Sequence, residues 1–565
     1  MRWTLKPKPE LHKVEALQQA LQVDAIIATL LVQRGIQTFE DAKRFFRPSL
    51  NDLHDPFLMK DMDLAVARIE KAIANKENIL VYGDYDVDGT TSVALMASYL
   101  KTRTPNVATY IPDRYDEGYG ISFQGIDFTH DNGFTLVIAL DCGIKAIDKV
   151  AYAKEKSIDF IICDHHRPGN ELPKAVAVLD PKRGDCSYPY KELCGCGVGF
   201  KLVQALTVQE GKTVEDLTAY LDLVAIAIGA DIVPITGENR VLAYFGLQVI
   251  NQIPRTGIQA LIAQVRKQEL TITDVVFIIA PRINAAGRMK HGNYAVALLM
   301  EIDLNLAEQY AAEIEVFNTD RRDADKQITE EALAQIEAQK EQDRHTTVVY
   351  NETWHKGVIG IVASRLTDTY YRPTLVFTKS GEKLAASARS VPGFDVYNAL
   401  EACNAYIEQF GGHKYAAGLT LKEEHYEAFK KAFEDEVSKT IDKHLLTPEI
   451  KVDAKIDLQQ IDSKLWRIIK QFAPFGPGNM TPIFMTDDLI DTGYGKCVGE
   501  DDAHLRLNVT STTLSDQNLV AIGFGMGDKL DIISNKKPFS AVYSIDENEW
   551  QGRKSLQLKL RDIKA

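Results

Sequence analysis

Short apolar runs that end in acidic residues or histidines recur in the first half of the chain, and they constrain its fold most. Three of them are NILVYGDYD (78–86), TLVIALDCG (135–143) and DFIICDHH (159–166). Near-continuous apolar runs of this length are typical of strands in a parallel sheet that is covered on both faces. The segments between them, such as 90–102 and 146–156, have the pattern of amphipathic helices. Together they predict a doubly wound α/β domain, in which ligands bind outside the carboxyl ends of the strands.

The rest of the chain divides into three further parts. Residues 301–343 lack Gly and Pro and are rich in Glu, Ala and Gln, which predicts one long connecting helix, with Asn318 and Thr319 as a candidate point of interruption. A second α/β unit is expected to follow over 345–445. The short alternating runs of 451–565 predict a small β-barrel or sandwich.

The composition excludes several classes of protein. Of the 565 residues, 45% are hydrophobic and 25% are charged, which excludes a disordered or fibrous chain. The 65 Lys and Arg against 79 Asp and Glu give a net charge of −14, so a globally basic nucleic-acid-binding surface is excluded, although a local basic groove is not. Seven Cys favour reduced thiols over a disulfide scaffold, and we find no signal peptide or membrane-length apolar run. We therefore expect a cytoplasmic protein.

Three carboxylates follow the first apolar run, in GDYDVDG. Asp84, Asp86 and Asp88 alternate along what we expect to be a strand end, so that their side chains can converge on one face, and Thr90 and Thr91 could cap the helix that follows. Carboxylates packed this closely repel one another unless cations neutralise them, and hard divalent ions prefer oxygen ligands. Taken alone, the motif would more often be an acidic surface turn.

Three further groups favour a metal site over a turn. Asp141 ends the second run, Asp164, His165 and His166 end the third, and Asp231 follows the apolar run LVAIAIG. One such acid could merely cap a helix, but four groups at the carboxyl ends of one sheet are hard to attribute to coincidence. Carboxylates with imidazoles suit Mn²⁺ or Mg²⁺, and there are enough ligands for two ions that activate water for phosphoester hydrolysis.

Other catalytic patterns are not found. Cys194 and Cys196 have the wrong spacing for a zinc knuckle, and the sequence contains no GxxxxGK[ST] phosphate loop. No pattern of Ser, His and Asp or of Cys and His competes with a water nucleophile.

The second α/β unit carries cations among glycines. In FGGHKYAAG (410–418), backbone N–H groups and the imidazole of His413 would form a phosphate cradle, the more so if a helix begins there. Arg389, in SARS, offers a guanidinium for phosphate. Each motif, taken separately, would more often be a charged surface turn. A similar mix upstream, in PRINAAGRM, comprises Arg282, Asn284 and Arg288.

The order of these motifs resembles a known family. GDYDVDG, LDCGI, DHH and GADIVP resemble the four motifs of the DHH phosphoesterase superfamily, and FGGHKYAAG resembles the signature of its DHHA1 partner domain. The motifs RINAAGRM, WHKGVIGIVASRL, SARSVPGFD and PFGPGN resemble those of the RecJ branch, bacterial single-strand-specific 5′→3′ DNA exonucleases. The match covers about 75–480, although Met480 and Thr481 depart from the proline-containing form of the last motif.

The resemblance implies a fold class and a domain order. It implies an α/β protein with a doubly wound parallel-sheet DHH domain, a long connecting helix, a smaller α/β DHHA1 domain and a C-terminal all-β OB-fold. The expected ranges are an N-terminal extension packed on the DHH domain (1–75), the DHH catalytic domain (76–300), the helix (301–343), the DHHA1 substrate-binding domain (344–450) and the OB-fold (451–565).

The resemblance also assigns roles to residues. The implied metal ligands are Asp86, Asp88, Asp141, His165 and Asp231. Asp84 and His166 complete the implied catalytic set. The residues implied to bind substrate are Asn284, Arg288, Arg389, Ser390, Gly411, Gly412 and His413, with Tyr119 in a base-stacking or positioning role.

The implied function is degradation of single-stranded DNA from its 5′ end to mononucleotides by two-metal hydrolysis with Mn²⁺ or Mg²⁺, in DNA repair and recombination. The implied partners are single-stranded DNA and, as candidates, a single-strand-binding protein and a RecQ-type helicase; we expect a monomer without membrane association. In the barrel, Phe484, Tyr494, Phe524 and Trp550 could stack on bases or could equally form its core. Two alternatives remain: hydrolysis of short oligonucleotides, cyclic dinucleotides or bisphosphonucleosides, and a binding scaffold without catalysis.

Overall fold

The computed structural model describes residues 1–512 and 518–565, without the side chains of 534–536 and 550. The predicted role of the Trp550 side chain therefore lies outside the described residues. The chain forms two compact units, of which the first comprises Met1–Arg2, Asn284–His291 and Tyr310–Glu449, and the second comprises Trp3–Ile283, Gly292–Gln309 and Ile450–Ala565. No single helix in the described ranges is long and apolar enough to cross a membrane; two short N-terminal helices meet that criterion only as a bent pair.

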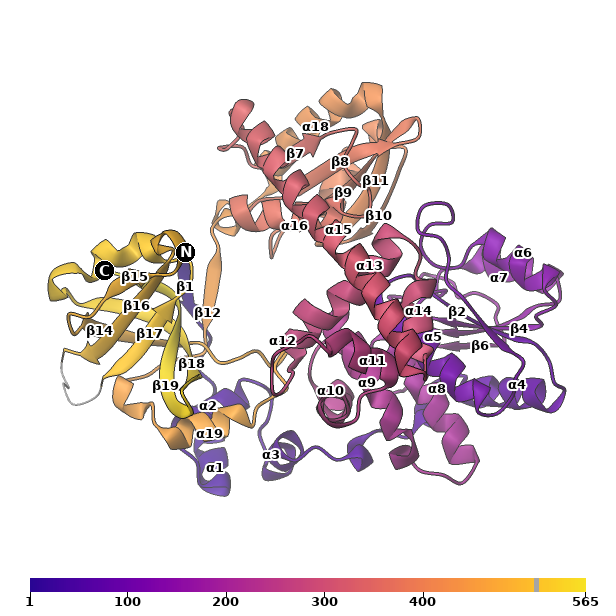
Figure 1. Cartoon of the computed structure of the whole chain (residues 1–565), viewed down its shortest axis with the longest axis horizontal. Helices are drawn as coiled ribbons and strands as arrows, with labels where there is room; N and C mark the ends of the chain where they lie inside the picture. Colours follow the sequence, from indigo (N-terminus) through magenta and orange to yellow (C-terminus); the bar gives the residue numbers. More distant parts are fainter. Residues whose placement is uncertain (513–517) are drawn as a thin grey trace. The chain divides into compact units, whose positions relative to one another are not determined.

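A five-stranded parallel sheet organises the middle of the second unit. Its strand order is β3-β2-β4-β5-β6 (Figure 1), and every residue of β2 and β4 is buried, because helices cover both faces. The chain leaves β2 toward β3 and returns on the other side to β4, which puts the topological switch point between β2 and β4. The doubly wound parallel sheet predicted from the sequence is confirmed. Its strands are β2 (Ile79–Gly83), β3 (Val107–Tyr110), β4 (Leu136–Leu140), β5 (Asp159–Cys163) and β6 (Ala177–Leu179).

Helices lie on both faces of this sheet (Figure 1). Alternate strand residues such as Leu80, Val137 and Phe160 pack with α6 and α7 in one hydrophobic cluster. The helices α4, α5 and α8 contact the strands from the other side. Their bounds are α4 (Met62–Ala74), α5 (Val87–Lys101), α6 (Phe123–Asp131), α7 (Ile147–Glu155) and α8 (Gly195–Gln209).

The apolar run before Asp231 is a helix, so the prediction that Asp231 ends a strand of the sheet is wrong. Residues Leu221–Ala230 form α9, whose first nine residues are buried, in contact with α5, α8 and α10 (Gly237–Gln252). A short run that is apolar on every side does not distinguish a buried strand from a buried helix. Asp231 is nevertheless brought to the same place, at the end of α9.

The long connecting helix is α15, which runs unbroken from Leu304 to Ala338 (Figure 1). The interruption predicted near Asn318 and Thr319 does not occur. Asn318 is buried and its side-chain oxygen accepts a hydrogen bond from Arg321 Nη2 at 3.0 Å, within the helix. The preference of Asn and Thr for caps and turns is therefore outweighed by packing.

The first unit contains a second, mixed sheet of order β10-β11-β9-β8-β7. Only β7 and β8 run parallel; the other pairs are antiparallel. FGGHKYAAG forms the β10–β11 hairpin, so the helix that could have begun there is absent. The elements are β7 (Thr347–Tyr350), α16 (Ile359–Tyr370), β8 (Thr374–Ser380), β9 (Lys383–Arg389), α17 (Val396–Ala402), β10 (Gln409–His413), β11 (Ala416–Lys422) and α18 (Tyr426–Thr440).

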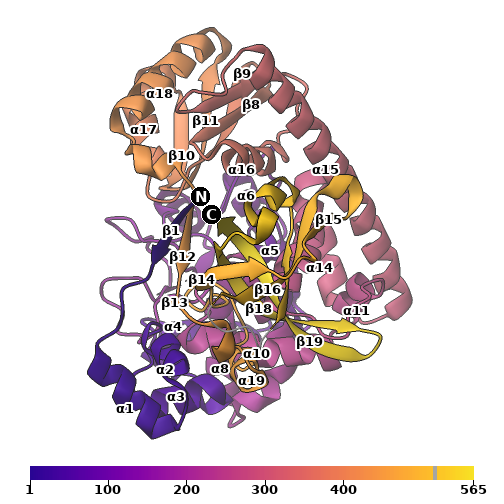
Figure 2. The same ribbon diagram turned by 90° about the vertical axis from the view of Figure 1, so that its left-hand side faces the viewer.

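Residues of 451–565 form a closed barrel, as predicted. The strands pair in the ring β14-β18-β19-β17-β16, and a second pairing of β14 with β16 closes it, while β13 and β15 lie at its edges. Figure 2 shows β14, β16 and β18 side by side. The strands are β13 (Ala454–Lys455), β14 (Phe484–Asp491), β15 (Lys496–Val498), β16 (His504–Ser511), β17 (Leu519–Gly523), β18 (Phe539–Trp550) and β19 (Arg553–Lys564). Phe484 is fully buried and so belongs to the core, whereas Tyr494 and Phe524 are exposed.

The N-terminal segment is divided between two neighbours. Its first helices share one hydrophobic core with the barrel, in which Leu30 and Phe45 belong to the same cluster as Phe484. The later part of the segment contacts the parallel sheet and its helices: Leu50–Asp52 contacts α10, Pro56–Leu58 contacts α8, and α4 contacts both α8 and β6. We expected all of 1–75 to pack on the DHH domain; the apolar faces of the first helices are instead covered by the barrel. The helices are α1 (Leu11–Leu21), α2 (Ala25–Val32) and α3 (Phe39–Phe46).

Candidate metal centre and phosphate-binding residues

Acidic residues follow neighbouring strands at the switch point of the parallel sheet. Asp84 comes directly after β2, Asp141 after β4, and Asp164 after β5. Because parallel strands end at one edge, these residues share that edge with the start of α5 and the end of α9.

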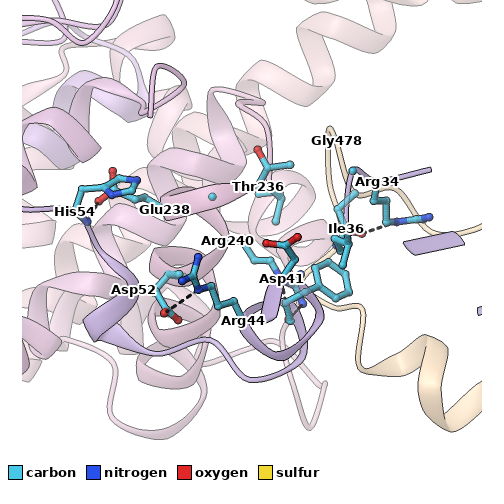
Figure 3. A pocket seen from close by; sticks show the side chains of 16 residues that line it. Arg34, Ile36, Asp41, Arg44, Asp52, His54, Thr236, Glu238, Arg240 and Gly478 are labelled. Atoms are coloured by element: carbon cyan, nitrogen blue, oxygen red, sulfur yellow. Dashed lines mark hydrogen bonds and ion pairs between the residues drawn. The ribbon is translucent and has the colours of Figure 1, made fainter. Parts of the chain in front are cut away.

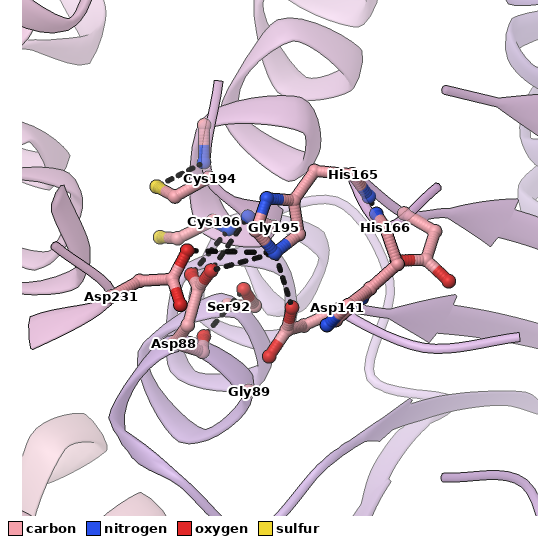
Figure 4. A network of polar contacts seen from close by, with 12 residues as sticks. Asp88, Gly89, Ser92, Asp141, His165, His166, Cys194, Gly195, Cys196 and Asp231 are labelled. Carbon is pink, nitrogen blue, oxygen red and sulfur yellow. Dashed lines mark hydrogen bonds and ion pairs between the residues drawn. The ribbon is translucent and has the colours of Figure 1, made fainter. Parts of the chain in front are cut away.

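Three of the predicted carboxylates meet around His165 (Figure 4). Its Nε2 lies 3.2 Å from Asp141 Oδ1, 3.6 Å from Asp231 Oδ2 and 3.8 Å from Asp88 Oδ2. Asp88 and Asp141 are 2% exposed and His165 is 8% exposed, whereas Asp231 is 30% exposed. One nearly buried pocket thus gathers residues that are up to 143 positions apart, from 88 to 231.

The start of α5 positions the acids of the first motif. Asp86 is the N-cap of α5 and its Oδ1 accepts the Gly89 N–H at 3.0 Å, while Asp88 lies in the first turn. The three acids therefore do not alternate along a strand, and Thr90 and Thr91 do not cap the helix; their hydroxyls donate to carbonyl oxygens one turn back. The strand stops at Gly83 because the close-packed GDYDVDG turn leads directly into a helix.

The N-terminus of α8 holds the carboxylate of Asp88. The N–H groups of Gly195 and Cys196 donate to its two oxygens at 2.6 and 2.7 Å. A Cβ on Gly195 would lie 2.6 Å from Asp141 Oδ1, so only glycine allows this close approach. These backbone donors were not predicted, because nothing in the sequence around Cys194 indicates which side chain the helix end faces.

Asp164 organises the loop that carries the two histidines. One of its oxygens accepts from the N–H groups of His165 and His166 and lies 2.8 Å from His166 Nδ1, and the other accepts from Ile144 N. Burial alone would raise the pKa of Asp164, but the hydrogen bond and positive charge of His166, with the backbone donors, lower it to about 2. Burial likewise opposes the charge of His166, yet its bond to Asp164 raises the pKa of His166 to about 9.

The electrostatics of the pocket favour a bound cation. Burial, with the charge of His166, lowers the pKa of His165 to about 3, so its imidazole is neutral and can donate a lone pair. Burial and then the repulsion of neighbouring acids raise the pKa of Asp88 to about 7 and that of Asp231 to about 8. The pKa of Asp141 is raised well above its usual range for the same reasons. A divalent ion among these groups would relieve both the burial penalty and the repulsion.

The donor set fits Mn²⁺ or Mg²⁺. Asp141 Oδ1 and His165 Nε2 are buried and make no hydrogen bond within the described residues. Two groups could each hold an ion, with ligand atoms within 4.8 Å of one another: Asp141, His165 and His166, and Asp88, His165 and Asp231. Oxygen and imidazole ligands suit these ions, whereas the buried thiol of Cys194, whose pKa burial raises well above its usual range, is a poor ligand at neutral pH.

Two further residues border the pocket. The Tyr119 hydroxyl lies 3.3 Å from His166 Nε2 and donates to the Asp141 carbonyl oxygen at 3.4 Å, so the predicted residue does reach the cluster. Asp180, which we did not predict, follows β6 and is fully buried, and burial raises its pKa to about 7. Its position directly after the apolar run AVAVL was the available signal.

In the first unit, cationic groups gather at the N-terminus of α16. Arg389 Nη1 donates to Ser387 Oγ at 2.9 Å, and a Cβ on Gly360 would lie 3.1 Å from Arg389 Nη2. Arg288, in α13 (Ala280–Met289), donates to the Gly357 carbonyl oxygen at 2.9 Å, just before the helix. Two guanidinium groups and a helix N-terminus form a setting suited to phosphate. Ser387 was missed, although its spacing of two from Arg389 puts both on one face of β9.

The other predicted substrate-binding residues lie nearby in the chain or on the hairpin. Asn284 is in α13 and is partly exposed. Ser390 directly follows β9, and its hydroxyl donates to the Phe394 carbonyl oxygen at 3.1 Å. Gly411, Gly412 and His413 are exposed on β10.

Comparison with known proteins agrees with this fold and site. The family model "DHH family, N-terminal domain" matches residues 78–228, the model "DHHA1 domain" matches 344–439 and the model "RecJ OB domain" matches 452–562. The fold and the acidic pocket define a metal-dependent phosphoesterase of the DHH class.

Full-length relatives make the assignment more specific. The chain is 37% identical to the single-stranded-DNA-specific exonuclease RecJ of Bacillus subtilis, over 100% of this chain and 70% of that protein. It is 31% identical to the RecJ of Salmonella typhimurium, over 99% of this chain and 100% of that protein. The crystal structure of RecJ in complex with Mn²⁺ from Thermus thermophilus matches with a TM-score of 0.86 at 26% identity, over 100% of this chain and 79% of that one. A second RecJ structure, bound to manganese, matches with a TM-score of 0.61 at 30% identity, over 70% of this chain and 97% of that one. The chain belongs to the RecJ family, and the family and fold class predicted from the motifs are confirmed.

Proposed function

We propose that this chain is a single-stranded-DNA-specific exonuclease that degrades DNA from the 5′ end to mononucleotides by two-metal hydrolysis. The observation that carries the proposal is the buried meeting of Asp88, Asp141 and Asp231 on His165 Nε2. Cations would relieve the repulsion among these acids, and the site has the ligands that Mn²⁺ and Mg²⁺ prefer. The names of its relatives supply the substrate class.

The residues of the pocket have different proposed roles. Asp86, Asp88, Asp141, His165 and Asp231 are the proposed metal ligands, with Asp84 and His166 as supporting groups. Divalent ions held by these residues would supply an activated water and would stabilise charge on the leaving oxygen. Asp164 orients His165 and His166 through its hydrogen bonds, and Tyr119 lies where it can position a substrate group beside His166.

The first unit is proposed to hold the 5′ end of the strand. Arg389, Ser387 and Arg288 lie around the N-terminus of α16, where a phosphate would receive both charge and backbone N–H groups. Asn284, Ser390 and the exposed β10 residues Gly411, Gly412 and His413 are proposed to contact adjoining phosphates.

The barrel is proposed to bind the incoming strand. Tyr494, Lys496 and Arg506 line a surface cavity of about 570 Å³ over β15 and β16. Phe524 is exposed and makes an edge contact with His504, and Lys559 lies over its ring. Aromatic rings beside cations are suited to stacking on single-stranded bases. A role in repair and recombination as a cytoplasmic monomer, with a single-strand-binding protein and a RecQ-type helicase as partners, completes the proposal.

The test compares strands of one sequence in three forms: single-stranded with a 5′ phosphate, blunt duplex, and dinucleotide. With Mn²⁺ present, labels at either end should reveal release of mononucleotides from the 5′ end of the single strand alone, and chelation should abolish release. Equal hydrolysis of the dinucleotide would favour a short-oligonucleotide phosphodiesterase instead. DNA binding without any Mn²⁺-dependent release would favour the scaffold.

A further inference from the structure

The PFGPGN motif, residues 474–479, does not belong to the barrel wall and lies against the segment that follows Asp231. The Ile235 N–H donates to the Pro477 carbonyl oxygen at 2.7 Å. A Cβ on Gly476 would lie 2.5 Å from Ile235 Cγ1, and a Cβ on Gly478 would lie 2.9 Å from Thr236 Cγ2. The glycines thus permit close contact between this loop, which we call the 474–479 loop, and residues 232–236.

The segment begins with an unusual backbone conformation. Ile232, next to Asp231, has φ 57°, in the left-handed region that β-branched residues rarely adopt. Helices that end this way usually have glycine at this position. The Ile232 side chain is 65% exposed, so its own packing does not hold the conformation. Contacts further along the segment must therefore maintain it.

Two other side chains hold the same segment. The Tyr190 hydroxyl donates to the Pro234 carbonyl oxygen at 3.2 Å and lies 3.1 Å from Thr236 Oγ1. Asn239 Nδ2, fully buried, donates to the carbonyl oxygens of Pro234 at 3.0 Å and Glu192 at 2.5 Å. The segment is thus bonded on one side to the 474–479 loop and on the other to residues of the catalytic domain.

The loop itself is firmly anchored. Asn479 Nδ2 donates to the carbonyl oxygens of Phe472 at 2.8 Å and Pro474 at 2.9 Å, and its Oδ1 accepts from Arg34 Nε at 2.9 Å. Arg240 Nη1 donates to Phe472 as well, at 2.7 Å. A cavity of about 340 Å³ adjoins these contacts (Figure 3). Because this space is not filled by packed side chains, the segment depends on its contacts with the loop and on its hydrogen bonds to Tyr190 and Asn239.

We propose that the 474–479 loop is a positioning element for Asp231. Asp231 is bonded on one side into α9, where its N–H donates to the Ala227 carbonyl oxygen at 2.9 Å, and on the other side it is joined to Ile232. Its carboxylate, 30% exposed, lies 3.6 Å from His165 Nε2 and depends on that backbone for its direction. The loop holds residues 232–236, these hold Ile232 in its left-handed conformation, and Ile232 directs Asp231 into the pocket. The inference rests on the metal centre proposed above.

The test uses substitutions that disturb the contact without touching a proposed ligand. Gly476→Ala places a methyl group against Ile235, whereas Gly184→Ala, the control, adds the same methyl group where nothing lies within 4 Å. Tyr190→Phe removes the hydrogen bond to Pro234 and keeps the ring. Mn²⁺ binding to metal-free protein is measured by the paramagnetic resonance signal of free Mn²⁺, the melting temperature is recorded in chelator and in Mn²⁺, and single-strand binding is measured in chelator.

Gly476→Ala should raise the Mn²⁺ dissociation constant about tenfold, as residues that support metal ligands do. Tyr190→Phe should raise it about fivefold, the size of one neutral hydrogen bond. Mn²⁺ should raise the melting temperature of both variants by less than it raises that of the wild type. The affinity of both variants for single-stranded DNA should not change. Gly184→Ala should match the wild type in every measurement.

Wild-type Mn²⁺ affinity in both folded variants would overturn the positioning role. If Gly476→Ala fails to fold, Arg34→Lys, which removes the hydrogen bond from Arg34 Nε that anchors Asn479 of the loop, replaces it, and wild-type Mn²⁺ affinity in that variant would overturn the role of the loop. A wild-type protein that binds no Mn²⁺ would instead refute the metal centre itself, and the two failures are thus distinguishable.

Discussion

Asp141 has an unusual backbone conformation. Its φ of 59° is left-handed, its N–H donates to the Cys163 carbonyl oxygen at 2.8 Å, and its Oδ1 lies 3.2 Å from His165 Nε2. Asn tolerates the same backbone conformation, so Asp141→Asn removes the charge and keeps the shape. We expect nuclease activity to fall about a hundredfold or more, as when one charge-stabilising group leaves a reaction centre.

The matched control is Asp148→Asn, whose carboxylate is 64% exposed on α7. Nucleotide release and single-strand binding are measured for both variants. Only release by Asp141→Asn should fall; retained release would contradict its assignment as a ligand.

The ionisation of the same pocket predicts how stability depends on pH. The pKa is about 7 for Asp88, about 8 for Asp231 and about 9 for His166, all raised above their usual values. From about pH 6.5 to pH 9 the folded, metal-free protein therefore binds more protons than the unfolded chain, and its free energy of unfolding falls as pH rises. With saturating Mn²⁺ the decline should vanish. Calorimetry in chelator and in Mn²⁺ tests this, and a stability that rises with pH in chelator would contradict it.

The chemistry of the pocket was more predictable from sequence than its geometry. Apolar strands that end in Asp84, Asp141 and Asp164 indicate a common edge, because parallel strands end together. Asp231 was expected at a strand end and lies at a helix end instead, where only tertiary packing brings it to His165. The donors at Gly195 and Cys196 are backbone N–H groups, which every non-proline residue has, so the residue types there could not have predicted their role.

Among the elements, the β10–β11 hairpin depends on one glycine. Gly412 has φ 148°, and a Cβ there would lie 2.4 Å from the Ala416 carbonyl oxygen. Gly412→Ala should distort the hairpin at a cost of about 1–3 kcal/mol and weaken binding of the 5′ end. Gly418→Ala, on β11 of the same hairpin, serves as the control, because a Cβ there would lie no closer than 3.7 Å to its nearest neighbour, the Ala386 carbonyl oxygen.

Thermal unfolding and affinity for 5′-phosphorylated single strands are measured for both hairpin variants, together with Mn²⁺ affinity, which neither change should alter. Equal behaviour of the two variants would show that the hairpin does not need glycine at 412.

Helices and strands could be predicted from sequence where the hydrophobic residues follow one clear periodicity. The runs at β2, β4 and β5 and the alternating strands of the barrel were identified correctly, whereas the run at Leu221–Ala230, apolar on all sides, has no period that separates helix from strand. The hairpin at 410–418 was missed because its glycines suggested a phosphate loop, and only the pairing with β9 shows the strand.

At the scale of the whole molecule, helices α1–α3 and the barrel share one core. Leu30, fully buried, belongs to the same hydrophobic cluster as Phe484 and Leu558. Leu30→Ala should lower the free energy of unfolding by about 2–5 kcal/mol, and the barrel should melt together with the helices. Leu64→Ala, 48% exposed on α4, should have little effect. Denaturant unfolding followed by hydrogen exchange in β14 and β19 measures both; barrel protection that survives Leu30→Ala unchanged would contradict a common core.

This shared core has a consequence for biosynthesis. The apolar faces of α1–α3 leave the ribosome long before the barrel strands that cover them, which extend to Ile563. At the usual rate of synthesis, these apolar faces remain uncovered for roughly half a minute or longer before the barrel is complete. A nascent chain of this enzyme is therefore a natural client for holding chaperones, and strains that lack them should accumulate it in aggregates.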